Sequence, residues 1–156
     1  MSPAGRSGPL PAAVDPAGVR RLLAVAAAGV VPWTVVVGPD LTLVFPFGLV
    51  NDNPWFLVNA LDYLRLTPGG RAAYIDAWLI GAALYGVALA LAALGTVDVE
   101  DPRLTGGLLV CAALSQFPLA AGFTRRIGYV AVPVGSVLLL GVAWRWYWPA
   151  VGAAGR

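Results

Sequence analysis

The segment FPFGLVNDNPWFLVNALDYLRL, residues 45–66, decides how the chain is organised. It is apolar at both ends, and Asn51, Asp52 and Asn53 make its middle polar. A helix needs about twenty consecutive apolar residues to cross the hydrocarbon of a bilayer, so this segment is too polar to span. Because its ends are too apolar for a solvated loop, we expect it to lie along a membrane surface and to dip partly into it.

The second half of this segment has the pattern of a short helix. Asn53 can cap free backbone amides, and Pro54 suits the first helical position because its missing N–H would have no helical partner there. Asn59, Asp62 and Arg65 then recur every three residues on one face, opposite an apolar face. The pattern predicts an amphipathic helix that starts at Pro54 and lies flat in the membrane interface.

The first half of the segment is interrupted by Pro46 and Gly48, and we expect it to be irregular. Backbone groups buried in hydrocarbon must find partners, so residues 45–50 are predicted to cap the mouth of a helical bundle, with the Asn51 and Asn53 side chains bonding to local backbone. The NDNP sequence is either a simple turn or a ligand or partner contact. The candidate lid or partner contacts are Phe45, Phe47, Asn51, Asn53, Trp55, Asp62 and Arg65.

The composition is that of a lipid-embedded protein. Of 156 residues, 59% are hydrophobic and 12% are charged, against about 25% charged residues in soluble domains. The absence of His excludes His metal sites and Ser-His-Asp or Cys-His catalysis, and a single Cys excludes an intrachain disulfide. We expect Cys111 to be buried because its neighbours are apolar. No metal, cofactor or catalytic residue is predicted.

Four stretches are long and apolar enough to cross a bilayer. They cover residues 22–38, 74–95, 104–123 and 128–148. We therefore predict an all-α membrane protein with four transmembrane helices and an interfacial helix over 54–66, in one domain spanning 19–150 behind a disordered tail of residues 1–18. The first stretch is the shortest, and Pro32 is expected to kink it. A re-entrant hairpin is the alternative to a span there.

The placement of arginines indicates an orientation. With the N-terminus in the cytoplasm, six arginines face inward and four outward. If the first stretch is re-entrant, the three N-terminal arginines instead lie on the same side as those four, which gives seven on one side against three on the other. In the four-span arrangement, the acidic residues among 98–101 are expected to meet Arg20, Arg21 or Arg145 at the inner end. Exposed ion pairs of this kind orient loops more than they hold a fold.

The interiors of the four stretches contain no ionisable residue, which argues against a proton relay or an ion path. The polar groups nearest a midplane are Ser115 and Gln116, close to Pro118. We expect Gln116 to form an interhelical hydrogen bond to Thr34 or Ser136. A substrate contact at the midplane polar site is the alternative.

Several short motifs resemble a known family. They are FPFGLVN at residues 45–51, Pro32–Trp33, Ala77–Trp78 and TGGLL at residues 105–109. Together they resemble small haloarchaeal integral membrane proteins of uncharacterised function, over most of residues 20–148. The resemblance implies an archaeal cell membrane and helical spans, but no activity, cofactor or residue role. The basic residues are all Arg, and Asp outnumbers Glu seven to one, which also suits a halophilic source.

Function is inferred by elimination. Without catalytic groups or buried charges, we expect a non-enzymatic membrane protein that serves as an accessory or scaffolding subunit of a membrane assembly. The partners expected are membrane lipids and another membrane protein subunit, and no nucleic acid. One alternative is a small-solute or lipid-handling permease with a polar site near Gln116. Another is a membrane enzyme that uses Asp62 or Asp76.

Overall fold

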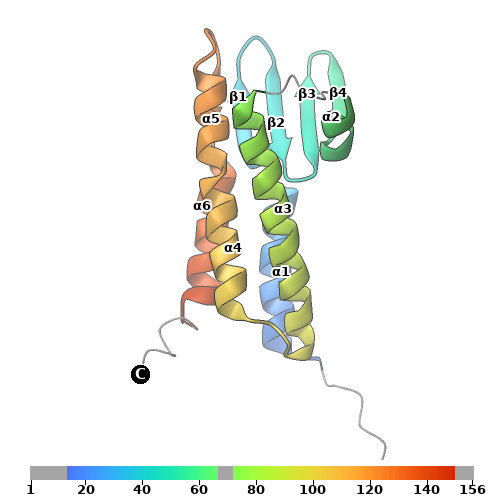
Figure 1. The fold of residues 1–156 in the computed structure, drawn as a ribbon, viewed down its shortest axis with the longest axis vertical. Coiled ribbons are helices and arrows are strands. Elements are labelled where there is room, and N and C mark those ends of the chain that lie inside the picture. Colours follow the sequence, from blue (N-terminus) through green and yellow to red (C-terminus); the bar gives the residue numbers. More distant parts are fainter. Residues whose placement is uncertain (1–13, 67–71, 150–156) are drawn as a thin grey trace, which may run out of the picture.

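A computed structural model describes residues 14–66 and 72–149 of the chain. Its elements are α1 (Pro16–Val30), β1 (Thr34–Val37), β2 (Leu41–Phe45), β3 (Gly48–Asp52), β4 (Trp55–Asn59), α2 (Ala60–Leu66), α3 (Ala73–Leu94), the 3₁₀ turn η1 (Gly95–Val97), α4 (Pro102–Leu114), α5 (Gln116–Thr124), β5 (Val130–Val132), α6 (Val134–Val142) and the π-helical segment η2 (Ala143–Tyr147). The molecule is elongated (Figure 1). A helical bundle forms its lower end in that view, which we call the basal end, and a sheet backed by helices forms its upper end, which we call the apical end.

The prediction of an all-α protein with four transmembrane helices is wrong, because a five-stranded sheet occupies the apical end. The stretch at 22–38 changes from helix α1 to strand β1, and the stretch at 128–148 changes from strand β5 to helix α6. The interfacial helix expected over 54–66 is strand β4 followed by the short helix α2. Three of the five expected helices therefore contain strands.

The other two expected helices are present. Residues 74–95 lie in α3 and η1, and residues 104–123 lie in α4 and α5, which follow one another with only Ser115 between them. Within the described residues, two helical stretches, Ala73–Val97 and Pro102–Thr124, are long and apolar enough to cross a membrane.

Pro32 ends the first helix instead of kinking it. Val31 has an extended backbone, with φ −94° and ψ 141°, because a residue before proline is disfavoured in the helical region. Thr34, Val35, Val36 and Val37 are all β-branched, which favours a strand once the helix has stopped.

Proline and glycine in the next segment mark hairpin turns. Pro46–Phe47 joins β2 to β3, and Asn53–Pro54, whose peptide bond is cis, joins β3 to β4. The irregular cap expected at 45–50 is therefore made of two paired strands, with Phe45 opposite Gly48. Strand pairing satisfies backbone groups that an irregular segment would leave unpaired.

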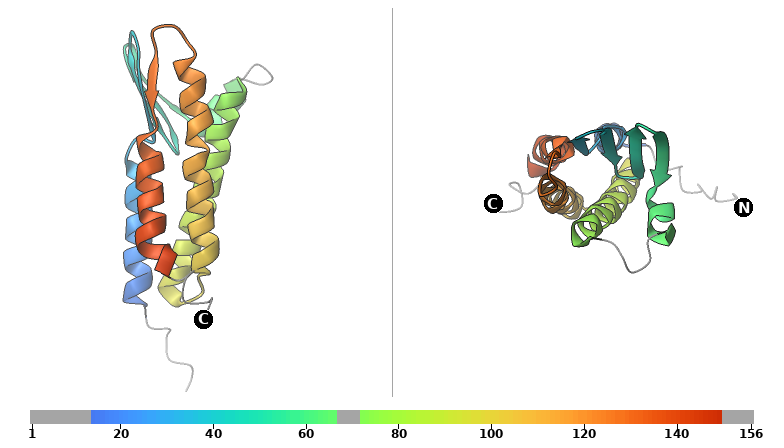
Figure 2. Two further views of the ribbon diagram at one scale, coloured as in Figure 1. Left: turned by 90° about the vertical axis from the view of Figure 1, so that its left-hand side faces the viewer. Right: turned by 90° about the horizontal axis from the view of Figure 1, so that it is seen from above.

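The sheet has the order β4-β3-β2-β1-β5, and all neighbouring strands are antiparallel. Its inner face packs against α3 and α5, which lie on one side of the sheet (Figure 2). The buried residues of this layer are Val36, Val44, Ile75, Trp78 and Leu119. The apical end is thus a two-layer structure with helices on one face only in the described chain.

The basal bundle is formed by α1, the lower half of α3, α4 and α6 (Figure 1). Its core mixes small and large side chains, among them Val25, Ala88, Leu109 and Leu139, so that the helices approach closely. Cys111 on α4 is exposed, against the expectation that its apolar neighbours bury it.

The predicted tail over residues 1–18 falls mostly outside the described residues, which begin at residue 14. Within the described part, the carboxylate of Asp15 accepts hydrogen bonds from the backbone N–H groups of Ala17 and Gly18 (3.0 and 2.8 Å). Asp15 is therefore the N-cap of α1.

The two parts join where two chain segments change between helix and strand side by side. The backbone N–H of Trp33 donates to the Val44 carbonyl (2.6 Å), and the N–H of Gly135 donates to the Trp33 carbonyl (2.8 Å). The Trp33 indole N–H donates to the carbonyl of Ala28 (3.0 Å), one of the last carbonyls of α1, which have no helical partner. Trp33 therefore links α1, β2 and α6 through hydrogen bonds.

We expect Gly135→Ala to lower the free energy of unfolding by about 1–3 kcal/mol. A Cβ at Gly135 would lie 2.6 Å from the Cα of Trp33, and this backbone cannot move without disturbing the junction. The measurement is the thermal unfolding midpoint of the purified protein. Gly141→Ala on the same helix is the control, because a Cβ there meets no atom within 4 Å and Ala favours the helix. Equal midpoints for the two variants would contradict this close packing.

Candidate functional site

Five of the seven predicted lid or partner contacts lie on the apical hairpins, and the other two, Asp62 and Arg65, lie on α2. Phe45 ends β2 and Phe47 lies in the turn to β3, and their rings stack with centroids 5.2 Å apart. The carbonyl of Phe45 accepts a hydrogen bond from the indole N–H of Trp78 on α3 (2.9 Å). This hairpin tip is thus anchored to α3, while the ring of Phe47 stays 54% exposed.

Asn51 and Asn53 meet at the opposite end of the hairpins. The side-chain N–H of Asn51 donates to the Asn53 carbonyl (3.3 Å), and the Asn51 side-chain oxygen accepts from the Thr42 hydroxyl (3.1 Å). The prediction that Asn51 bonds to local backbone is confirmed. The prediction that Asn53 caps a helix starting at Pro54 is wrong, because both residues form the turn into β4.

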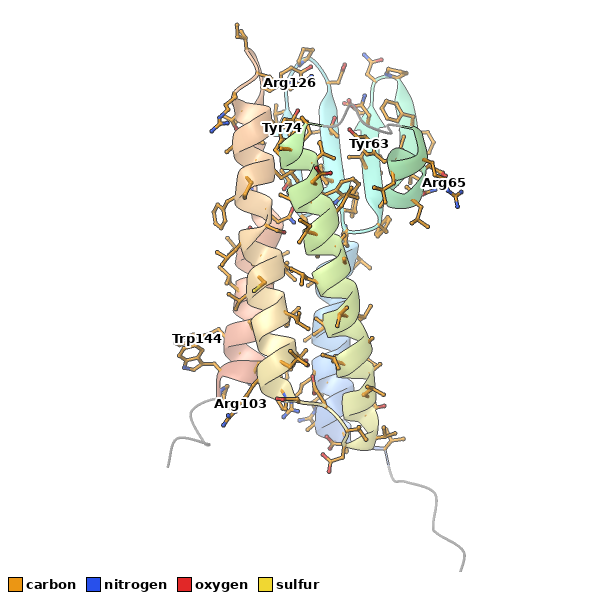
Figure 3. All side chains as sticks on the ribbon, viewed as in Figure 1. Tyr63, Arg65, Tyr74, Arg103, Arg126 and Trp144 are labelled. Carbon is orange, nitrogen blue, oxygen red and sulfur yellow. The ribbon has the colours of Figure 1, made fainter. Side chains whose placement is uncertain are left out.

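The helix cap lies six residues further along, at Asn59. Its side-chain oxygen accepts from the backbone N–H of Asp62 (2.8 Å), and its side-chain N–H donates to the Asp62 carboxylate. Asp62 therefore serves the start of α2. Arg65, in the last turn of α2, points away from the sheet (Figure 3). Neither residue lies with Asn51 and Asn53, so the predicted lid residues do not form one site.

The outer face of the sheet carries an apolar row that crosses all five strands. Register places one residue of each strand in this row, since Val35 pairs with both Val132 and Leu43, Leu43 with Val50, and Val50 with Leu57. We call this row the outer sheet face. Its two end members are half-exposed, with Val132 49% and Leu57 53% exposed. An antiparallel sheet with one solvated face usually carries polar residues there.

Strand β4 also leaves one edge unpaired, because it is the last strand in the sheet order. Its residues Trp55, Phe56 and Leu57 are 75%, 39% and 53% exposed. Natural proteins usually protect an apolar edge strand, since its free N–H and C=O groups can pair with another chain. Of the predicted contacts, Trp55 therefore lies on a surface suited to association.

Ser115 and Gln116, predicted to form a midplane polar site, are packed between elements. Gln116 has no exposed surface; its side-chain oxygen accepts from the Thr34 hydroxyl (3.4 Å), and its side-chain N–H donates to the Ser115 hydroxyl (3.1 Å). The predicted bond to Thr34 is confirmed, but it is not interhelical, because Thr34 lies on strand β1. Ser136 is bonded elsewhere, to the Ala113 carbonyl (2.8 Å). Gln116 thus ties α5 to β1.

A buried ion pair lies at the basal end. A guanidinium nitrogen of Arg21 on α1 lies 3.3 Å from a carboxylate oxygen of Glu100, in the loop before α4, and the Glu100 side chain is only 2% exposed. The expected pairing of an acidic residue among 98–101 with an arginine at this end is confirmed for these two residues. A charge this deeply buried is stable only when it is paired.

Tyr147 completes this cluster, and no motif in the sequence singles it out. Its hydroxyl and the second carboxylate oxygen of Glu100 are both buried, and neither makes a hydrogen bond of good geometry among the described residues. Burial raises the pKa of the Tyr147 hydroxyl, and the negative charge of Glu100 raises this pKa further. Tyr147 is therefore a neutral hydroxyl beside the Glu100 carboxylate.

Across residues 14–66 and 72–149, no three Cys, Asp or Glu side chains gather closely enough to hold a metal ion. A family model described as a domain of unknown function (DUF8050) matches residues 5–155. The chain matches no curated protein. The family match covers both the bundle and the sheet, so both belong to the same family domain.

We expect Arg21→Gln to lower the free energy of unfolding by about 1–3 kcal/mol, because it leaves the Glu100 carboxylate buried without a counter-charge. The thermal unfolding midpoint reports the loss. Arg20→Gln is the matched control, since Arg20 is the exposed neighbour on the same helix. If the two variants unfold at the same temperature, the ion pair does not stabilise the basal end.

Proposed function

The chain belongs to the DUF8050 family, a domain of unknown function, and we propose that it is a non-enzymatic membrane protein that acts as a scaffolding subunit of a membrane assembly. In this proposal, two helical stretches cross the bilayer: α3, and the consecutive helices α4 and α5, which we call the α4–α5 rod. The outer sheet face and the free edge of β4 hold a second membrane protein. The observation that carries the proposal is the apolar surface that the fold leaves uncovered.

The long helices are apolar yet mostly unburied. In the most apolar 18-residue windows of Ala73–Val97 and Pro102–Thr124, only 28% and 39% of the residues are buried inside the protein. A core helix of a water-soluble protein is apolar because other elements cover it. Here Ile80, Val87 and Phe117 are 58%, 51% and 49% exposed. Lipid is the solvent that suits such surfaces.

Charged residues stand at both ends of an uncharged stretch in each of these helices, and the length of each stretch fits the thickness of a bilayer. Residues 77–97, between Asp76 and Asp98, and residues 104–124, between Arg103 and Arg125, contain no charged side chain. Each stretch is about 32 Å long at a rise of 1.5 Å per residue. The hydrocarbon of a bilayer is about 30 Å thick. Exposed Trp144 and Trp148 at the basal end suit the interface between lipid and water.

The apical end needs a partner for a separate reason. An open sheet edge is not stable against lipid, because its unpaired N–H and C=O groups find no water there. Its pairing with a strand of a partner would satisfy them. The outer sheet face, apolar on all five strands, would be covered by the same partner. Association at the sheet therefore explains both features.

Orientation and source are part of the proposal. Four described arginines, Arg20, Arg21, Arg103 and Arg145, lie at the basal end, against three at the apical end, so we place the basal end and the N-terminus in the cytoplasm. The all-Arg, Asp-rich composition supports a haloarchaeal cell membrane. A permease would need a solvated path to Gln116, and the burial of Gln116 against Thr34 offers no support for one.

Membrane integration predicts how the chain fractionates. After cell lysis, the full chain should stay in the membrane pellet through an alkaline carbonate wash and leave it only with detergent, because its apolar helix surfaces remain in lipid. Immunoblotting of the fractions measures this. A chain that is monodisperse in detergent-free buffer would refute membrane integration.

Photo-crosslinking tests the sheet contact. Leu57→benzoylphenylalanine, with the probe on the β4 edge, should give one discrete protein adduct in native membranes, and the added mutation Val50→Lys should remove it, since an unpaired ammonium in an apolar interface is strongly unfavourable. Val99→benzoylphenylalanine is the control, because Val99 is 65% exposed but lies at the basal end. If Leu57 and Val99 give the same adducts, or lipid adducts alone, the sheet is not the docking surface.

A further inference from the structure

A groove runs along the basal bundle between α4 and the α6–η2 segment. Its volume is about 690 Å³, within the range of about 300–1,000 Å³ that is usual for ligand sites. Its lining is almost wholly apolar and includes Gly107, Val110, Cys111, Gly141 and the two exposed tryptophans of this end, with Arg103 as its charged member. The groove is separate from the outer sheet face.

Glycines keep the groove open. A Cβ at Gly107 or at Gly141 would meet no atom within 4 Å, so no other part of the described chain fills the space above them. A Cβ at Gly106, by contrast, would lie 2.9 Å from the Cβ of Tyr147. Gly106 therefore lets η2 pack closely, while Gly107 and Gly141 leave room for something outside the chain.

The π-helical segment shapes one wall of the groove. Trp144 and Trp148 stack with ring centroids 5.1 Å apart and planes 22° apart, and they are 65% and 58% exposed. Tryptophan rings favour the depth at which lipid head groups meet acyl chains. Trp144 and Arg103 lie on the same side of the basal end (Figure 3). The tryptophan wall and the Arg103 guanidinium are therefore both placed for the boundary between lipid and water.

Arg103 gives the groove a positive end. It is exposed in the first turn of α4, where the helix dipole is also positive. The neighbouring Asp101 carboxylate accepts hydrogen bonds from the backbone N–H groups of Arg103 and Leu104. Within the described part of the chain, the Arg103 guanidinium has no carboxylate within ion-pair distance. An apolar groove with a cation at the membrane boundary complements an anionic amphiphile.

We propose that this groove binds one anionic phospholipid, with an acyl chain along Gly107 and Gly141 and the phosphate group at Arg103. The inference rests on the membrane location put forward above. An uncharged lipid would fill the apolar part but leave Arg103 unmatched. A partner helix would fill the groove without a phosphate group. The site therefore prefers phosphatidylglycerol to phosphatidylcholine with the same acyl chains.

Native mass spectrometry of the full chain in mild detergent, with each of these lipids added, tests the proposal. The wild-type chain should retain one phosphatidylglycerol in preference to phosphatidylcholine, and Arg103→Gln should reduce this retention about tenfold through loss of a charge-assisted contact. Gly107→Leu and Gly141→Leu should abolish retention of both lipids. The controls Arg20→Gln and Gly86→Leu should change nothing, since Arg20 is exposed on α1 and Gly86 faces open space on α3.

Alkylation of Cys111 supplies a second readout, because it is the chain's single cysteine and lines the groove. Phosphatidylglycerol should slow maleimide labelling of the wild-type chain several-fold, and Arg103→Gln should remove that protection. Equal protection by both lipids, unchanged retention in the leucine variants, or a bound protein in place of lipid would overturn the site. A chain that stays in membranes but shows no anionic preference overturns this inference alone, whereas a chain soluble without detergent overturns the membrane location as well.

Discussion

The junction at Trp33 is the constraint on which the rest of the structure depends. A helix that stops halfway along a protein leaves carbonyl groups without helical partners, and a buried polar group without a hydrogen bond is costly. Here the Trp33 indole bonds to the carbonyl of Ala28 in the last turn of α1 (3.0 Å), and the Tyr85 hydroxyl adds a bond to the carbonyl of Val25 about one turn earlier (2.8 Å). The two rings pack edge to face with centroids 5.1 Å apart. These contacts let α1 end where β1 begins.

Two kinds of surface follow from that junction. Below it, the helices cover one another only partly, which leaves apolar side chains and the groove at Gly107 facing outward. Above it, the sheet is covered by helices on one face, and its other face is apolar as well. The polar side chains that are buried, such as Gln116 with Thr34, bridge elements instead of lining a cavity. The features suited to binding a ligand or a partner, the groove and the outer sheet face, therefore lie on the surface.

Residue patterns predict those elements and contacts that depend on neighbours in sequence or on a side chain with few possible partners. Helix α3 and the consecutive helices α4 and α5 are long and apolar, and their charged residues, Asp76 and Arg103, lie in the first turns of α3 and α4. The bond from Gln116 to Thr34 follows because a buried amide has few partners available, and the Arg21–Glu100 pair follows because opposite charges gather at one end. The cap of α2 is harder to place, since Asn53 and Asn59 are equally good caps by residue type. Residues 55–59 form strand β4, so the helix begins only after Asn59.

Composition and spacing alone settle that the chain is strongly apolar and contains no His, and that two long apolar stretches carry charges only at their ends. These properties need no knowledge of distant neighbours. The five strands are different. Each has only three to five residues, and a strand of that length has no stability until others pair with it. Apolar runs such as Thr34–Val37 suit a helix or a strand equally by hydrophobicity. Pairing between distant segments chooses the strand, and with it which apolar surfaces remain uncovered.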